Sequence, residues 1–175
     1  MLASAETVQT VAATLKRYKQ DFSIVLDPVR SSNKHHGNKS NLRQQVMIST
    51  SGHQLLPKAA VSVLREQLLP MTTILTPNIP EAKLLVQRSD AEDPQSQTDL
   101  VDLAKAVHAL GSKYVLLKGG HFKPISSEGT QGADHIIDVL FDGTEAMLID
   151  KPFVQSQNTH GTGCSLACMI LYITS

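Results

Sequence analysis

The apolar positions of this chain switch between helical spacing and short continuous runs. Between residues 8 and 15 they recur every three or four positions behind Ser4, a candidate N-cap, which predicts a first helix. The run 22–27, FSIVLD, is short and contains β-branched residues. Such a run is typical of a buried parallel strand.

The two patterns continue to the end of the chain. Helical spacing predicts helices at 57–69, 80–86 and 98–111 and a last one opened by GTGC at 161–164, whereas apolar runs predict strands at 72–76 and 113–118 and a hairpin over 135–150 that turns at Asp142-Gly143. Strands therefore alternate with helices along most of the chain. This order predicts an α/β fold with a mostly parallel sheet.

Two polar stretches interrupt these patterns. Residues 30–45 are basic and without periodicity, and we expect a flexible, disordered insertion there rather than an anion-binding segment. Residues 88–97 are interpreted as an ordinary linker between helices. The length of 175 residues is that of one domain.

Composition and charge exclude some classes of function. Sixteen basic and sixteen acidic residues leave no net charge that would indicate binding to nucleic acid or to a membrane surface. The apolar runs are too short to span a bilayer, and residues 1–20 lack a signal-peptide layout. The only two cysteines, Cys164 and Cys168, are four residues apart on one predicted helix, which favours a shared face over a disulfide and predicts a core position for Cys168. We therefore expect a reducing, cytoplasmic compartment.

The stretch HGTGC, residues 160–164, opens the last predicted helix with two glycines. The first N–H groups of a helix have no intrahelical partner, and Gly161 and Gly163 allow an anion to approach the backbone closely. The same positive end of the helix would lower the pKa of the Cys164 thiol and make it a candidate base. A glycine turn beside a small buried cysteine explains the spacing equally well.

Polar residues follow three predicted strands, where ligands bind in parallel sheets. Asp27 follows the first strand and is a candidate partner for a metal or phosphate, or else part of an Asp-Pro turn. Asn78 and Glu81 follow the second; Glu81 could reach Mg²⁺, although helix initiation is the simpler interpretation. Lys118, before Gly119, is a candidate phosphate contact or an exposed lysine beside a tight turn.

The order of LDPV, TSG, TPNIPEA, KGGH, DVLFDG and NTHGTGCSL resembles the hydroxymethylpyrimidine and phosphomethylpyrimidine kinases of thiamine biosynthesis. These kinases belong to the ribokinase-like superfamily, so the resemblance implies a three-layer α/β/α sandwich. Many members of the superfamily carry aspartate where this chain has Cys164, which favours the pyrimidine kinases.

The resemblance implies phosphorylation of a small pyrimidine alcohol, and then of its monophosphate, with ATP and Mg²⁺. It implies that Cys164 takes the hydroxyl proton while the N–H groups of 161–164 (Gly161, Thr162, Gly163 and Cys164) hold the transferring phosphoryl group. Lys118 and Gly119 would contact the ATP phosphates; Asp27, Asn78 and Glu81 would serve the metal and phosphates; and Met1 would line the pyrimidine site. A homodimer is an open option.

The chain also departs from the family pattern. Family members begin before the position of Met1 and continue beyond the helix opened by GTGC, and residues 30–45 interrupt a run that is compact in relatives. We therefore expect a partial, incomplete kinase domain over 1–175. Two alternatives remain: an inactive fragment that keeps a nucleotide site, and a kinase of another small alcohol such as pyridoxal.

Overall fold

The computed structural model describes residues 4–18, 23–28, 57–119, 135–152 and 162–174, with side chains in the last segment at 165–170 and 172. The predicted insertion at 30–45, and the candidate residues Met1 and Gly161, lie outside the described residues. Described elements in chain order are α1 (Ala5–Arg17), β1 (Val25–Leu26), α2 (Lys58–Val63), η1 (Leu64–Leu68), η2 (Leu69–Met71), β2 (Ile74–Leu75), α3 (Ile79–Leu85), α4 (Gln97–His108), β3 (Tyr114–Leu117), β4 (His135–Phe141), β5 (Ala146–Pro152) and α5 (Thr162–Thr174).

One mixed sheet carries the fold, with strand order β1-β2-β3-β4-β5. The first three strands are parallel, and β4 and β5 add an antiparallel hairpin to β3. The predicted α/β class and the predicted hairpin are therefore confirmed. The predicted strands at 22–27 and 72–76 are shorter than expected, because only two residues of each form ladder pairs.

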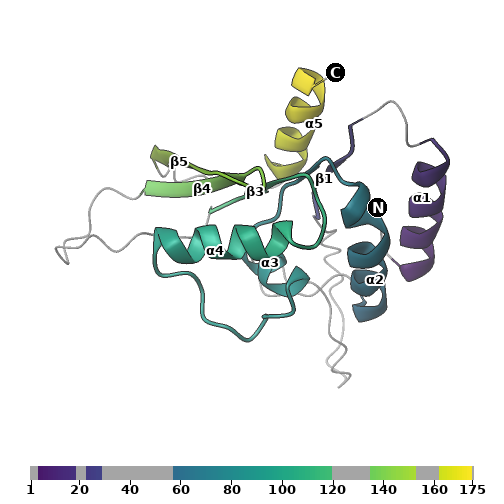
Figure 1. Ribbon diagram of the computed structural model, residues 1–175, viewed down its shortest axis with the longest axis horizontal. Coiled ribbons are helices and arrows are strands. Elements are labelled where there is room, and N and C mark those ends of the chain that lie inside the picture. The colour runs from purple at the N-terminus through teal and green to yellow at the C-terminus, as the bar shows by residue number, and fades with distance from the viewer. Residues whose placement is uncertain (1–3, 19–22, 29–56, 120–134, 153–161, 175) are drawn as a thin grey trace, which may run out of the picture.

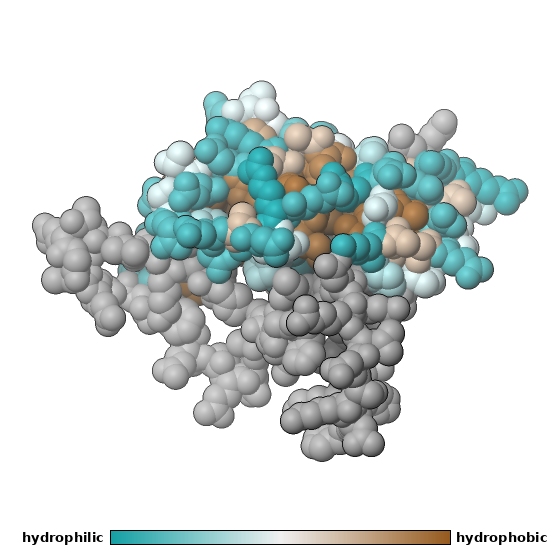
Figure 2. Space-filling model, turned by 90° about the horizontal axis from the view of Figure 1, so that it is seen from below, coloured by the Kyte–Doolittle hydropathy of each residue, from teal (hydrophilic) through white to brown (hydrophobic). Residues whose placement is uncertain are grey.

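Helices lie on both sides of this sheet (Figure 1). One side is covered by α4, which buries Leu100, Ala104 and Val107 against β3 and β4. On the other side α5 contacts β1. Near the β1 end of the sheet, α1 buries Val8 and Ala12 against α2 and η1. Figure 2 shows one face of the molecule, on which apolar areas are visible between hydrophilic side chains of the described residues.

The helix predicted over 57–69 does not continue as one regular α-helix. It begins at Lys58, changes to the π-helical turn η1 and ends in the 3-10 turn η2. Pro70 lies in η2, and a proline has no N–H to donate and clashes with the carbonyl four residues earlier. The α-helical ladder therefore cannot pass through this position.

The predicted core position of Cys168 is wrong, since the thiol is exposed. On helix α5 the partly buried residues are Leu166, Ala167 and Ile170, whereas Met169 and Tyr172 are exposed like Cys168. The spacing of the cysteines predicted a shared face but did not show which face the sheet covers. None of the helices formed by the described residues has the length and apolar content to cross a membrane.

The turn between β4 and β5 is fixed by the Asp142 carboxylate and by Gly143, whose φ of +103° is easily reached only by glycine. Asp142 Oδ1 accepts hydrogen bonds from the N–H of Glu145 at 2.7 Å and from the N–H and hydroxyl of Thr144, both at 2.8 Å. These bonds, that of Glu145 first, lower the pKa of Asp142 from 3.8 to about 2.

We expect this turn to lose stability in acid. Because the folded pKa of Asp142 is depressed, its contribution is present above the unfolded value of 3.8 and is lost as the pH falls toward about 2. Asp142→Asn keeps an acceptor that does not titrate, so the difference in unfolding free energy between the wild type and this variant should shrink from about pH 5 downward. Urea titrations across this range measure it, with exposed Asp90→Asn as the control. A pH-independent difference would contradict the assignment.

Candidate functional site

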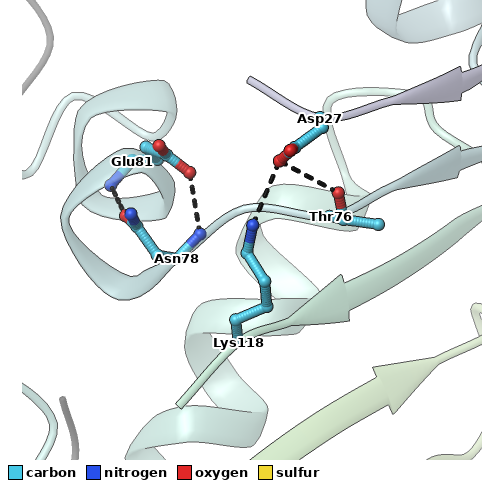
Figure 3. A network of polar contacts seen from close by, with 5 residues as sticks. All are labelled: Asp27, Thr76, Asn78, Glu81 and Lys118. Atoms are coloured by element: carbon cyan, nitrogen blue, oxygen red, sulfur yellow. Dashed lines mark hydrogen bonds and ion pairs between the residues drawn. The ribbon is translucent and has the colours of Figure 1, made fainter. Parts of the chain in front are cut away.

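The carboxyl ends of the three parallel strands bring together residues that are far apart in the sequence. Asp27 follows β1, Thr76 follows β2 and Lys118 follows β3. The strands are in register, since Leu26 pairs with Leu75 and Leu75 with Val115. Their ends therefore lie at one edge of the sheet, as the sequence predicts (Figure 3).

An ion pair spans this edge from β1 to β3. Lys118 Nζ lies 3.0 Å from Asp27 Oδ1, and the Thr76 hydroxyl lies 3.3 Å from the same oxygen (Figure 3). The side chains of Lys118 and Asp27 are only 17% and 9% exposed. Desolvation of such a pair offsets most of its attraction, so its presence is weakly explained by stability alone.

The second carboxylate oxygen of Asp27 is the atom of this site that still lacks a partner among the described residues. Oδ2 is buried and has no hydrogen-bond partner among the described residues. A buried, unpartnered carboxylate oxygen is costly unless a donor or a cation reaches it. A ligand that brings either one to this edge would remove that cost.

Asn78 and Glu81 have a local role that the sequence also predicts. Glu81 N–H donates to Asn78 Oδ1 at 2.8 Å, and the Glu81 carboxylate accepts the N–H of Asn78 at 2.9 Å, which forms a capping box (Figure 3). Helix initiation by these residues is thus confirmed, with Glu81 buried. The interaction of Asn78 and Glu81 with a metal ion or phosphate stays a prediction.

Lys118 and Gly119 are held from both sides, by the backbone of the segment that follows β2 and by a side chain of β4. The N–H of Lys118 donates to Pro77 O at 2.8 Å, and that of Gly119 to Asp138 Oδ1 at 2.8 Å. A Cβ on Gly119 would lie 1.9 Å from the carbonyl oxygen of Ile137. Glycine is therefore required at this position, because its backbone lies too close to that of Ile137 for a side chain. The Gly119 N–H is already donated to Asp138.

Sequence reasoning did not assign a role to Asp138. This carboxylate is 6% exposed and forms an ion pair with Lys151 of β5 in addition to its bond with Gly119. The available signal was an acidic residue inside the apolar strand HIIDVLF, where an unpaired charge would be costly.

The mouth of the last helix is only partly described. Helix α5 begins at Thr162, so the N–H groups of Thr162, Gly163 and Cys164 lie in its first turn. The side chains at these positions and Gly161 lie outside the description. The anion hole and the activated thiol therefore stay predictions, in a helix that contacts β1, the strand that precedes Asp27.

The side chains at this edge of the sheet suit a metal ion that is bound together with a phosphate ligand better than one that is held by protein side chains alone. Mg²⁺ usually binds one or two carboxylates together with waters and phosphate oxygens. Asp27 Oδ2 supplies one buried carboxylate oxygen of this kind. Within the described part of the chain, no group of three or more histidine, cysteine, aspartate or glutamate residues is placed to enclose an ion.

Comparison with known proteins identifies relatives over most of the chain. The family model described as phosphomethylpyrimidine kinase matches residues 35–172. The chain is 37% identical to a putative hydroxymethylpyrimidine/phosphomethylpyrimidine kinase 2 of Schizosaccharomyces pombe, over 97% of this chain and 28% of that protein. It is 38% identical to the hydroxymethylpyrimidine/phosphomethylpyrimidine kinase of Mycobacterium tuberculosis H37Rv, over 97% of this chain and 51% of that protein.

A solved structure shares the fold. The ADP complex of Bacillus subtilis pyridoxal kinase superposes with a TM-score of 0.69 and 26% identity, over 98% of this chain and 52% of that one. The chain thus spans about half the length, or less, of these relatives.

Gly119→Ala should destabilise the protein far more than Gly143→Ala. At Gly119 the new methyl group meets backbone at 1.9 Å, whereas at Gly143 it meets the movable ring of His108 at 3.0 Å and suffers mainly from positive φ. We expect a loss of about 1 kcal/mol for Gly143→Ala and several times that for Gly119→Ala, measured by urea unfolding. Equal losses would show that the backbone at Gly119 relaxes freely.

Proposed function

Since the chain belongs to the phosphomethylpyrimidine kinase family, we propose that it transfers phosphate from ATP to 4-amino-5-hydroxymethyl-2-methylpyrimidine and then to the resulting monophosphate. The observation that carries the proposal is the ion pair of Lys118 and Asp27 at the carboxyl edge of the parallel strands. That edge is where ligands bind in open α/β sheets.

Lys118 is the proposed contact for the ATP phosphates. Its ammonium is mostly desolvated and already turned toward the edge by Asp27, so binding requires little ordering of a long side chain. A phosphate oxygen can replace or join the carboxylate as the partner of this point charge. The N–H groups at the start of α5 are the proposed cradle for the transferring phosphoryl group.

Cys164 is the proposed base. Its thiolate takes the proton of the substrate hydroxyl while the bond from that oxygen to the γ-phosphorus forms and the bond to ADP breaks. Position three of α5 lies in the field of the unpaired helix N–H groups, which favours the thiolate. When bound, Mg²⁺ neutralises charge on the phosphates, and Asp27, with Asn78 and Glu81 nearby, is the group proposed to face it.

The pyrimidine is the proposed substrate, with Met1 against its ring. Pyridoxal is the second candidate, because a pyridoxal kinase shares the fold at 26% identity. A panel of both alcohols with Mg-ATP separates the two. The third candidate is an inactive nucleotide-binding fragment, which would show a thermal transition raised by Mg-ATP without transfer to either alcohol.

Lys118→Met should weaken ATP binding by about tenfold or more, because a charged hydrogen bond to phosphate is lost. Lys113→Met is the matched control: Lys113 lies at the other end of β3, with its Nζ over the Tyr114 ring at 5.2 Å. Isothermal titration calorimetry with Mg-ATP measures both variants, after thermal melts show that they fold. Equal affinities of the two variants would remove Lys118 from the phosphate site.

Cys164→Ala should lower the rate of transfer by about a hundredfold or more while ATP affinity stays near the wild-type value, since only the base is removed. Exposed Cys168→Ala, one turn further along α5, should have no effect on either quantity. Phosphate transfer from radiolabelled ATP measures the rate. Undiminished turnover in Cys164→Ala would overturn the assignment of the base.

A further inference from the structure

Asp138 connects the hairpin of β4 and β5 to the segment that carries Lys118. Its carboxylate lies between two donors from different elements: the Gly119 N–H at 2.8 Å from Oδ1, and the Lys151 ammonium at Oδ2. The side chain of Lys151 is half exposed, whereas Asp138 is buried. The described ladder between β3 and β4 ends with Leu117 opposite Val139, so the carboxylate extends the connection beyond the last strand pair.

This connection holds the backbone of Lys118 and Gly119 from one side. On the opposite side, Pro77 O accepts the N–H of Lys118 at 2.8 Å. The carbonyl of Ile137 leaves no room for a side chain at position 119, so the Gly119 peptide lies directly against β4. The direction in which the Lys118 side chain leaves the backbone is therefore fixed from β2 and from β4 before it reaches Asp27.

Burying the carboxylate of Asp138 in β4 costs free energy of desolvation, which suggests that the residue serves to hold the Lys118–Gly119 segment. Its neighbours Ile137 and Val139 are 3% and 0% exposed, and an apolar residue at 138 would avoid the desolvation of a carboxylate. The amide of Gly119 and the ammonium of Lys151 together satisfy the charge. An apolar replacement would leave the Gly119 N–H unpaired and the segment free to move.

We propose that Asp138, supported by Lys151, is a positioning residue for Lys118: it fixes the backbone of Lys118 and Gly119 so that the ammonium meets the nucleotide phosphates. This inference rests on the proposed function of the same edge. Asp138 acts through Gly119 and Lys118, and its own two oxygens are committed to Gly119 and Lys151.

A double-mutant cycle on ATP affinity tests the proposal. Asp138→Ala should weaken Mg-ATP binding by about tenfold in the wild-type background and leave it unchanged in the Lys118→Met background, because the positioned group is already absent. Asp138→Asn should recover much of the affinity, since its side-chain oxygen still accepts the Gly119 N–H. Equal weakening by Asp138→Ala in both backgrounds indicates a general structural effect and would overturn the proposal.

Asp150→Asn is the matched control. Asp150 lies next to Lys151 on β5, and its carboxylate pairs with His135 Nδ1 of β4 at 2.8 Å, so its loss perturbs the same hairpin without touching Gly119. We expect no change in ATP affinity for this variant. A loss of affinity as large as that of Asp138→Ala would assign the effect to hairpin stability and not to positioning.

Amide hydrogen exchange separates this proposal from the proposed function. Exchange at the Gly119 N–H should be about tenfold or more faster in Asp138→Ala, with little change in Asp150→Asn. Unchanged protection at Gly119 would overturn the positioning role even in an active kinase. If the wild-type protein binds no Mg-ATP, the proposed function is overturned, and with it the role of Asp138 in positioning Lys118 for the nucleotide. Faster exchange in Asp138→Ala would in that case show only that Asp138 holds the Gly119 N–H. If Asp138→Ala does not fold, Lys151→Met takes its place: loss of the ammonium that holds Asp138 should speed exchange at the Gly119 N–H, and unchanged protection there would overturn the proposal.

Discussion

The parallel alignment of β1, β2 and β3 is the constraint on which the rest of the site depends, because it places Asp27 and Lys118 within 3.0 Å although 91 residues separate them. The backbone ladders that secure this alignment are short, with two pairs between β1 and β2. A slip by one residue would turn every side chain to the opposite face of the sheet. Much of the register must therefore come from packing, and the fully buried Leu75, Val115 and Leu117 supply it beneath the polar edge.

The antiparallel hairpin has a different task from the parallel strands. It contributes the longest ladder of the described sheet and places a buried acid against the end of β3. Two carboxylates thus lie in poorly solvated positions on either side of Lys118, with different consequences. Asp138 has partners for both of its oxygens, whereas Asp27 has one oxygen without a partner among the described residues. A saturated carboxylate is suited to holding structure, and an unsaturated one is suited to meeting a ligand.

Local patterns predicted much of the fold, and contacts between distant segments account for what they missed. The capping box of Asn78 and Glu81 and the turn at Asp142-Gly143 depend on residues within three positions of each other, so the sequence predicts both. The meeting of strand ends followed from the parallel order alone. The bond from Asp138 to Gly119 could not be predicted, since it depends on the register between β3 and β4. Cys168 was misplaced because helical spacing defines a shared face and not the element that covers it.

The ion pair at the strand ends is better explained by a ligand than by stability. If Asp27 served only to neutralise Lys118, apolar residues of similar volume at both positions would hold the strands at least as well. The arrangement instead keeps an ammonium directed toward the edge, with a hydroxyl from Thr76 on the same carboxylate and one carboxylate oxygen unused by the described residues. An incoming polyphosphate would find a cation already desolvated and oriented, and an accompanying divalent ion would find an acceptor. In the proposed reaction the desolvation of both groups is therefore completed during folding and does not have to be repeated when the nucleotide binds.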